Sequence, residues 1–521
     1  MAEPKRNKTV WYNKFMLTSS AIVLSQIVAS PAMAQSSDLG VEILQMLVDE
    51  GVIPFDKAQT LLDEARRREA LKAEEEAAAE AETTINVPYI PEVLKDSIKE
   101  EVEADVIETA KQEGWVAPNS LPEWVKGVRI SGDMRARYQK EEMPKDGNFP
   151  SFPDVAEINR QGGVTDADGF PLLNSVKDRL RPNYRARIKF KADINRFTEM
   201  GIRLATGDDE SPISTNSTFG EYFNKENIWI DQAYIKVQPF EELVVVAGRM
   251  PNPFFSTNMV WDTDINPEGF ALVGEYDVFQ NLSVFGAGGF FPLQERALYP
   301  DTNLYGAQLG LSAEFMGVFS YKTAFSYYSF ENIQSVKNPE GGSQVNDWSA
   351  PIYLSKGNSI FNMRTDGVTT LAGLASEFEL GAVIAEFAYK PNDLEFKLTG
   401  EAVENFAMDV EDIADLRAEA GVKPGNFGWH VRVDAGYPNV EKFGDWKVSA
   451  GYRHVETDAV LDVFTDSDFG LGGTDQEGYI LRGDVGIYDN TALGVAVLSS
   501  DSINRAPFST DIYQVNLSVK F

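Results

Sequence analysis

The sequence contains no cysteine, so no disulfide can stabilise the fold. Small exported domains usually need disulfides, whereas a large sheet that closes on itself does not. With a mean hydropathy of −0.26, the chain is too polar for a bundle of transmembrane helices. Positive charge is also scarce, because 47 Lys and Arg stand against 80 Asp and Glu, for a net charge of −33. Nucleic acids are bound by basic surfaces, so they are not expected as partners.

The only apolar run that approaches the length of a helix lies at the N-terminus. Four basic residues within positions 5–14 precede a mostly apolar stretch from Phe15 to Ile27, and Ala32-Met33-Ala34 follows. This order is typical of a secretory signal peptide, with cleavage after Ala34, so residues 1–34 are expected to be removed. An uncleaved membrane anchor is the alternative, but the run is short and is interrupted by Thr18, Ser19 and Ser20.

Residues 35–122 differ from the rest of the chain, because they are acidic and have helical spacing. Ile43, Leu44 and Leu47 fit one helix, and Pro54 begins a second that ends in a Glu/Ala run. We expect a helical periplasmic segment here, ending at a proline-rich break. The short apolar repeat leaves two interpretations, a solvated spacer or an oligomerising coiled coil.

From residue 125 onward the apolar pattern changes to a period of two. In residues 184–192, five apolar or small side chains share one face and four basic side chains share the other. Segments of about ten alternating residues, separated by turn residues, are the signature of a membrane β-barrel. The sequence therefore predicts an all-β transmembrane barrel over residues 123–521.

The connections between these segments come in two lengths. Short connections are predicted at 195–196, 239–240, 277–278, 316–317, 391–393, 438–443 and 489–490. Long connections are predicted at 140–180, 207–227, 251–268, 290–302, 329–380, 404–426, 456–477 and 501–508. Strict alternation requires Thr369 to Phe378 to belong to the fifth long loop, and it then gives about 16 antiparallel strands. Both termini of the barrel are expected on the periplasmic side.

The last strand ends the chain with alternating apolar residues and an aromatic residue, Phe521. This pattern looks like the C-terminal signal by which outer-membrane barrels are recognised for insertion. Phe521 is therefore the expected assembly signal, and the barrel assembly machinery and outer-membrane lipids are expected partners.

Several short motifs in the mature chain resemble those of one family. The motifs are Val87-Pro-Tyr-Ile-Pro-Glu92, Glu113-Gly-Trp115, Leu121-Pro-Glu-Trp124, Gly132-Asp-Met-Arg-Ala-Arg137, Ala247-Gly-Arg-Met-Pro-Asn-Pro253 and Trp261-Asp-Thr-Asp-Ile-Asn-Pro-Glu-Gly269. With them the sequence resembles the putative porin family of Gram-negative outer membranes, which is distantly akin to phosphate-selective porins. The resemblance implies passive diffusion of small hydrophilic solutes, assembly as a homotrimer, and no cofactor. No metal site is expected either.

The polar face of each strand is expected to line a wet lumen, and basic residues outnumber acidic ones on that face. The basic ladder is the set of cations that alternation places inward on the first three strands: Arg129, Arg135, Arg137, Arg185, Arg187, Lys189, Lys191 and Arg203. Arg249 is predicted to join this pore lining. The third loop is expected to fold inward and to bring Asp262, Asp264 and Glu268 opposite the ladder. These charges would either favour anions in the pore or only pair locally in the wall.

Two rival functions remain open from the sequence. In the first, the barrel is a structural anchor whose periplasmic helices link the outer membrane to peptidoglycan. In the second, it is an enzyme, but no serine or cysteine lies in a recognisable nucleophile motif, so no catalytic residue is expected.

Overall fold

The fold is given by a computed structural model that describes residues 127–521, apart from 145–146, 166–168, 209–210, 221 and 419–422. The expected signal peptide, residues 1–34, and the whole expected helical segment, residues 35–122, lie outside the described residues. Among the residues that are described, no helix is long and apolar enough to cross a membrane.

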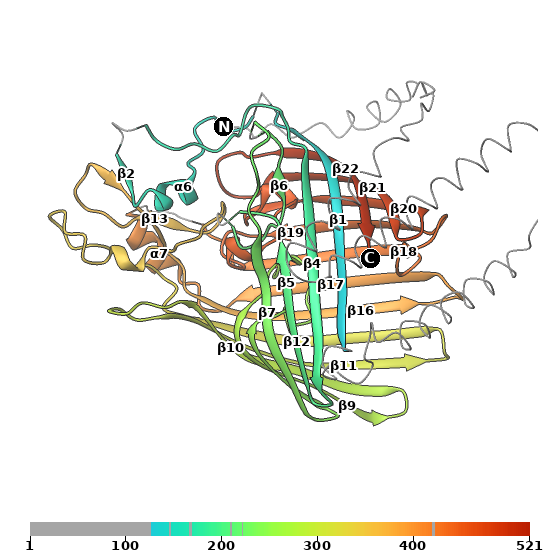
Figure 1. Ribbon diagram of the computed structural model, residues 1–521. Coiled ribbons are helices and arrows are strands. Elements are labelled where there is room, and N and C mark those ends of the chain that lie inside the picture. The colour runs from blue at the N-terminus through green and yellow to red at the C-terminus, as the bar shows by residue number, and fades with distance from the viewer. Residues whose placement is uncertain (1–126, 145–146, 166–168, 209–210, 221, 419–422) are drawn as a thin grey trace, which may run out of the picture. The chain divides into compact units, whose positions relative to one another are not determined.

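One antiparallel sheet closes into a ring and forms nearly all of the described structure (Figure 1). Its sixteen long strands follow one another around the ring in chain order. They are β1 (Val128–Glu142), β4 (Asn183–Asn195), β5 (Thr198–Ala205), β7 (Trp229–Phe240), β8 (Leu243–Arg249), β9 (Glu268–Phe279), β10 (Leu282–Gln294), β11 (Thr302–Phe315), β12 (Phe319–Glu331), β16 (Phe378–Tyr389), β17 (Glu395–Asn405), β18 (Phe427–Gly436), β19 (Trp446–Val455), β20 (Gln476–Tyr488), β21 (Thr491–Ser502) and β22 (Thr510–Lys520). The predicted barrel of sixteen strands is confirmed.

The ring closes where the first strand pairs with the last. Strand β1 lies between β4 and β22, and its register with β22 runs from Asp133↔Lys520 to Glu142↔Asp511. Beyond this register, the backbone N–H of Gly132 donates to the carbonyl oxygen of Phe521 at 3.0 Å, and the N–H of Phe521 donates back at 3.0 Å. A ring of this kind has no exposed sheet edge, and all strand backbone groups find partners within it.

Short turns and long loops alternate around the barrel, as the sequence predicts. We number the long loops 1 to 8; they comprise residues 143–182, 206–228, 250–267, 295–301, 332–377, 406–426, 456–475 and 503–509. Two short turns lie a few residues later than predicted. Strands β7 and β9 continue through the predicted positions, and the turns are Glu241-Glu242 and Gln280-Asn281.

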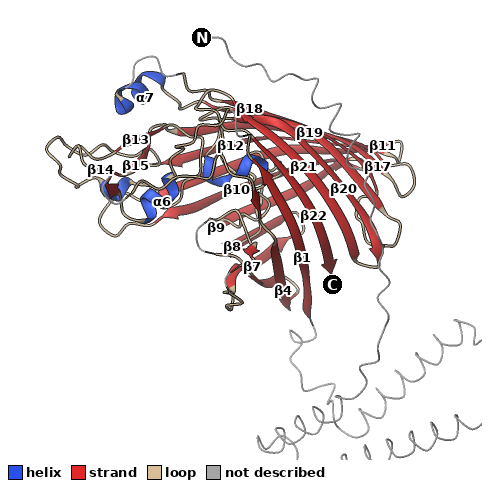
Figure 2. Ribbon diagram, turned by 90° about the horizontal axis from the view of Figure 1, so that it is seen from above, coloured by secondary structure: helices blue, strands red, loops and turns tan. Residues whose placement is uncertain are grey.

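The remaining described elements are small, and they belong to the long loops. They are α6 (Val155–Arg160), β2 (Val164–Thr165), β3 (Arg179–Leu180), β6 (Ser217–Thr218), η2 (Asp347–Ser349), β13 (Ile360–Asn362), β14 (Thr369–Thr370), β15 (Ala372–Leu374), α7 (Val410–Arg417), η3 (Asp462–Phe464) and η4 (Phe469–Leu471). Figures 1 and 2 place α6, α7 and β13 beyond the same end of the barrel. Strands β14 and β15 lie inside loop 5, so the assignment of residues 369–378 to a loop holds up to Phe378, where β16 begins.

The two faces of the barrel wall differ in chemistry. Along β1, Ile130, Met134 and Tyr138 are exposed, whereas the alternate residues Arg137 and Gln139 are buried. This alternation places apolar side chains on the outer face and polar side chains on the inner face, as in barrels that contact lipid.

A chain of aromatic rings lines the outside of the short-turn end. Phe319 stacks with Phe315 at 5.6 Å, with Phe387 at 5.8 Å and with Tyr389 at 5.0 Å between ring centroids. Tyr389 in turn stacks with Phe396 at 6.3 Å. Aromatic belts of this kind mark the level of the lipid headgroups.

Candidate functional site

The basic ladder lies on the inner face of β1, β4 and β5. The strand register sets Arg135 directly opposite Arg185, and Lys189 directly opposite Arg203. Like charges that face each other across two strands are destabilising, so this arrangement requires carboxylates nearby.

One carboxylate of the wall lies between two ladder arginines. Asp133 accepts from Arg185 Nη2 at 2.9 Å and from Arg187 Nε at 2.8 Å. At the short-turn end, Arg129 pairs with Asp193 at 3.0 Å, and Lys191 pairs with Glu199 at 3.2 Å. These ion pairs join residues of neighbouring strands. The cations in the middle of the ladder therefore depend on loop residues for further partners.

Loop 3 enters the barrel and is held first by aromatic residues. Phe254 packs edge-on against Tyr328 at 5.0 Å and against Phe291 at 6.0 Å. Trp261 packs edge-on against Tyr328 at 5.3 Å. Tyr328 is fully buried, and Trp261 is only 5% exposed, so the loop forms part of a hydrophobic core inside the barrel.

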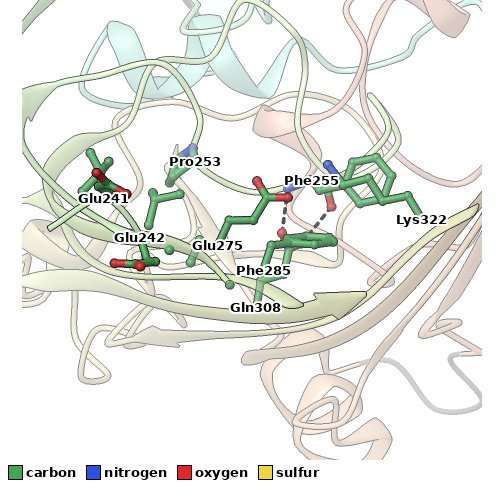
Figure 3. Close-up of a pocket in the computed structure, with 13 residues that line it drawn as sticks. Glu241, Glu242, Pro253, Phe255, Glu275, Phe285, Gln308 and Lys322 are labelled. Carbon is green, nitrogen blue, oxygen red and sulfur yellow. Dashed lines mark hydrogen bonds between the residues drawn. The ribbon is translucent and has the colours of Figure 1, made fainter. Parts of the chain in front are cut away.

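A side-chain amide of β11 also binds the backbone of this loop (Figure 3). Gln308 accepts from the N–H of Phe255 at 2.8 Å and donates to its carbonyl oxygen at 2.8 Å. The ammonium of Lys322 lies 4.4 Å from the ring centroid of Phe255 and 4.5 Å from that of Phe285. These residues line a cavity of about 340 Å³, with Glu241 and Glu242 at its other end.

Further along, loop 3 reaches the far strands of the ring. The hydroxyl of Thr257 donates to Glu401 of β17 at 2.5 Å, and its N–H donates to the same carboxylate at 3.1 Å. Asn258 accepts from Arg453 of β19 at 2.6 Å. Because these contacts hold the loop against β17 and β19, the loop crosses the interior instead of projecting from the rim.

The end of loop 3 meets the basic ladder. Asp264 accepts from Arg187 Nη1 at 2.9 Å, and Arg185 Nη1 lies 3.8 Å from the same oxygen. Asn266 accepts from Arg203 at 3.3 Å, and Arg203 also pairs with Asp231 of β7. Strands β4 and β17 are nearly opposite in the ring order, so loop 3 spans the barrel.

Loop 7 joins loop 3 inside the barrel, which the sequence did not predict. The N–H of Asp262 donates to the carbonyl oxygen of Phe464 at 2.8 Å, and the N–H of Ser467 donates to the Asp262 carboxylate at 2.9 Å. Asn258 donates to Asp466 at 2.5 Å. We call the joined loops 3 and 7 the two-loop septum.

The septum carries carboxylates that differ in their electrostatics. Burial, together with the nearby Asp466 and Asp264, raises the pKa of Asp262 to about 8. Burial alone would also raise the pKa of Asp468, but Arg137 and Arg482 outweigh it, so the pKa of this group is lowered. Asp468 accepts from Arg137 Nη1 at 2.6 Å and remains a carboxylate.

The predicted pore-lining and loop residues lie on the inner face or in loop 3, except for Arg249 and Glu268. Arg137, Arg185, Arg187 and Arg203 contact septum residues, and Asp262 and Asp264 lie in loop 3, as expected. Glu268 is the first residue of β9, not part of loop 3, and its carboxylate pairs with Arg249 at 2.5 Å.

The register explains the position of this pair. Arg249 and Glu268 alternate with Gly248 and Gly269, and they share the face of Phe270, which is 63% exposed. The alternation thus places Arg249 and Glu268 on the outward face at the rim, apart from the ladder. Strand β8 reads Leu-Val-Val-Val-Ala before Gly248, so its sequence does not mark which face is inward.

The structure shows no metal-binding cluster among the residues it describes: no group of three or more His, Asp or Glu side chains is arranged to hold an ion. The site that remains is a charged constriction formed by wall and loops. Its groups can attract, repel and orient charged solutes.

A closed antiparallel barrel with an apolar outer face and a charged, loop-crossed interior defines a transmembrane β-barrel of the channel class. Residues 37–521 match the family described as "Putative porin", and the chain belongs to this family. Porins are outer-membrane proteins, so the predicted family and the predicted membrane are confirmed. The comparison with curated proteins finds no match.

Several solved structures of outer-membrane proteins are similar to this chain. OprB of Pseudomonas putida is 10% identical with a TM-score of 0.44, over 76% of this chain and 95% of that one. The outer-membrane channel DcaP of Acinetobacter baumannii is 10% identical with a TM-score of 0.39, over 76% and 97%. OmpF of Salmonella typhi, solved with daunomycin, is 12% identical with a TM-score of 0.40, over 76% and 99%.

Proposed function

We propose that the protein is a passive diffusion channel for small hydrophilic solutes, and that its basic ladder favours anions at the two-loop septum. The observation that supports the anion preference is that some cations of the ladder form ion pairs and others do not. Arg185 and Arg187 share Asp133 and Asp264, whereas Arg135 and Lys189 form no ion pair among the described residues.

The surroundings of these two cations support the proposal. Arg135 donates from Nη2 to the amide oxygen of Asn216 at 2.6 Å, while its Nε is buried without a partner. Lys189 lies 5.7 Å from the ring centroid of Tyr234. Neither contact neutralises the charge, so both cations act on an ion that passes the septum.

The acidic character of the whole chain does not cancel this effect. Charges in water are screened over about 10 Å at 0.1 M salt, so distant carboxylates act weakly on an ion in the constriction. Wall charges within that distance act strongly, because the surrounding protein screens them less.

The channel and its selectivity can be tested together in a planar bilayer. Purified protein should give discrete conductance steps, and its reversal potential in a potassium chloride gradient should indicate anion preference. The double variant Arg135→Gln, Lys189→Gln should shift the reversal potential toward cations. Lys140→Gln serves as control, because Lys140 lies on the opposite face of β1 and pairs with Glu142 at 2.7 Å.

Two results would count against the proposal. Folded protein that gives no steps would contradict the channel. Steps with an unchanged reversal potential in the double variant would contradict the selectivity and leave the channel intact.

We further propose that the long loops face the outside and that both barrel ends face the periplasm. Support comes from β1 and β22, since the first begins and the second ends at the short-turn end of the barrel. We also propose that the protein assembles as a homotrimer, as its family suggests, and that the barrel assembly machinery inserts it. Crosslinking in native membranes, followed by electrophoresis, tests the trimer.

A further inference from the structure

A cavity of about 590 Å³ lies at the long-loop end, and none of its lining residues belongs to the basic ladder or to loop 3. Its walls come from loops 1, 5, 6, 7 and 8, which are far apart in the sequence. Cavities of this size hold small molecules in other proteins, and those that do are mostly apolar with a few well-placed polar groups.

Among the described residues, the charges that line this cavity are all positive. Lys356 of loop 5, Arg417 and Lys423 of loop 6 and Arg505 of loop 8 line it, and no carboxylate is among the described residues of its lining. This composition is notable in a chain with a net charge of −33, because it concentrates four cations at one opening.

Arg505 and Lys356 are positioned by contacts with neighbouring loop and strand residues. The guanidinium of Arg505 donates to the carbonyl oxygen of Asn358, and the N–H of Arg505 donates to Asp475 at 3.0 Å. The ammonium of Lys356 lies 3.3 Å from the amide oxygen of Gln476 and 4.8 Å from the ring centroid of Phe508. Both side chains are thus positioned before any ligand arrives, which lowers the entropic cost of binding.

The charge of Lys356 is retained at neutral pH. Burial lowers its pKa to about 8, while Asp475 and Asp462 oppose that shift. At pH 7 most of the population is therefore protonated, and the cavity stays cationic.

The part of the lining that comes from loop 1 is apolar. It comprises Phe149, Phe152, Pro153 and Val155. Phe149 is 44% exposed, and Phe152 packs edge-on against Phe508 at 5.3 Å, which fixes its ring. An inorganic anion would leave this wall unused, whereas an organic anion would cover it.

We propose that this cavity is an entry subsite for small organic anions, in which the cations bind a carboxylate and the loop 1 wall binds an apolar body. The proposal rests on the channel function proposed above and narrows the class of solute. A solute bound here lies at the long-loop end of the barrel. Its negative charge is opposite in sign to the basic ladder, so the ladder would attract it further into the pore.

Phenylacetate is a suitable probe, because it joins one carboxylate to one apolar ring. Added to the long-loop side of the full-length channel in a planar bilayer, it should reduce the current in a saturable manner. Acetate, which lacks the ring, and 2-phenylethylamine, which has the ring and the opposite charge, should each bind at least about tenfold more weakly. Calorimetry on the purified protein in detergent measures the same binding without relying on conductance.

Two variants test the two walls separately. Lys423→Gln should weaken phenylacetate about twofold to fivefold, as expected for the loss of one exposed ionic contact. Phe149→Ser should weaken phenylacetate about tenfold and leave the weak binding of acetate unchanged. Lys442→Gln is the matched control, because Lys442 is an exposed lysine in the short turn 437–445 at the other end.

Each outcome decides the proposal. Equal binding of the amine, equal binding of acetate, or unchanged affinity in both Lys423→Gln and Phe149→Ser would overturn it, as would no binding by calorimetry. Binding without conductance would support the subsite and contradict the channel, so the two failures are distinguishable.

Discussion

Arg187 of β4 and Asp264 of loop 3 form an ion pair in which Nη1 and Oδ1 are 2.9 Å apart. The same arginine donates from Nε to Asp133, and Arg185 lies within reach of both carboxylates. Arg185 and Arg187 of the wall thus form a network of ion pairs with two carboxylates, one from the wall and one from loop 3. This part of the ladder binds the septum, whereas Arg135 and Lys189 form no ion pair among the described residues.

Replacing Asp264 by Asn should make the channel more anion-selective. The change removes the carboxylate that Arg187 and Arg185 share, so one more positive charge is exposed to a passing ion. We expect the reversal potential in a salt gradient to move several millivolts toward anions. Glu268→Gln is the control, because Glu268 pairs with Arg249 on the outward face and should leave the potential unchanged. A shift toward cations in Asp264→Asn would argue against the ladder.

Replacing Gln308 by Leu should loosen loop 3 without unfolding the barrel. The amide of Gln308 satisfies both backbone groups of Phe255, and their loss should cost roughly 1–3 kcal/mol of loop packing. We expect more frequent transient changes of the current in single-channel recordings, because a loosened loop 3 would move within the pore. The control is Gln238→Leu, since the Gln238 amide donates only to Glu241 at the short-turn end. Quiet recordings from Gln308→Leu would show that the aromatic contacts alone hold the loop.

The septum should loosen as the pH rises through about 8. Asp262 has its pKa raised to about 8, whereas in an unfolded chain it would titrate near 3.8. Between these values the folded protein binds more protons than the unfolded chain, so the free energy that holds the loops together falls with rising pH. Transient conductance steps should therefore increase from about pH 6 to about pH 9, as Asp262 becomes charged beside Asp466.

A charge-neutral variant separates this effect from a general response to alkali. In Asp262→Asn, the number of steps should no longer depend on pH in this range. Asp366→Asn is the control, because hydrogen bonds from Thr369 and Val368 lower the pKa of Asp366 to about 2, outside the range tested. Persistence of the full pH dependence in Asp262→Asn would assign it to another group.

Deleting Phe521 should reduce the amount of assembled barrel. The deletion removes both backbone hydrogen bonds between Phe521 and Gly132 and the aromatic end of the last strand. Heat modifiability on gels of membrane fractions should show a several-fold loss of folded protein and more material in the periplasm. Phe521→Trp keeps the ring and the backbone bonds and should assemble normally. Normal levels after the deletion would exclude Phe521 as the assembly signal.

Removing residues 35–122 should leave the channel intact. The barrel strands begin at Val128 and close on each other, so their pairing does not require the preceding segment. A chain in which residues 1–34 are joined to residue 123 should give the same conductance and reversal potential as the full chain. A folded but silent barrel would instead show that the segment controls the pore. Detachment of the outer membrane from peptidoglycan in cells with this variant would support the anchor alternative.

The strands and their order could be predicted from local patterns. A strand that contacts lipid on one face must alternate, so segments such as residues 184–192 identify both their structure and their inner face. The positions of the turns are harder to predict from sequence. Polar residues such as Asp277 also occur within strands, on the face that points into the lumen. Strand β9 ends at Phe279, three residues further than the predicted turn at 277–278 would allow.

The composition of the septum could not be predicted in full. Asp262 and Asp264 could be predicted because they lie in the third long loop, which was expected to fold into the barrel. The contacts of Asp262 with Phe464 and Ser467 join residues about 200 positions apart, and no local sequence pattern indicates such a contact. An acidic, glycine-rich loop 7 was visible in the sequence, but nothing in it indicated the inward direction.

The seam between β1 and β22 has a consequence for the order in which the barrel folds. Its register joins residues that are far apart in the chain, from Asp133↔Lys520 to Glu142↔Asp511. All other neighbours in the ring are consecutive long strands, so their pairing closes much shorter loops. Because the entropic cost of loop closure rises with loop length, we expect the hairpins to pair first and the seam to form last.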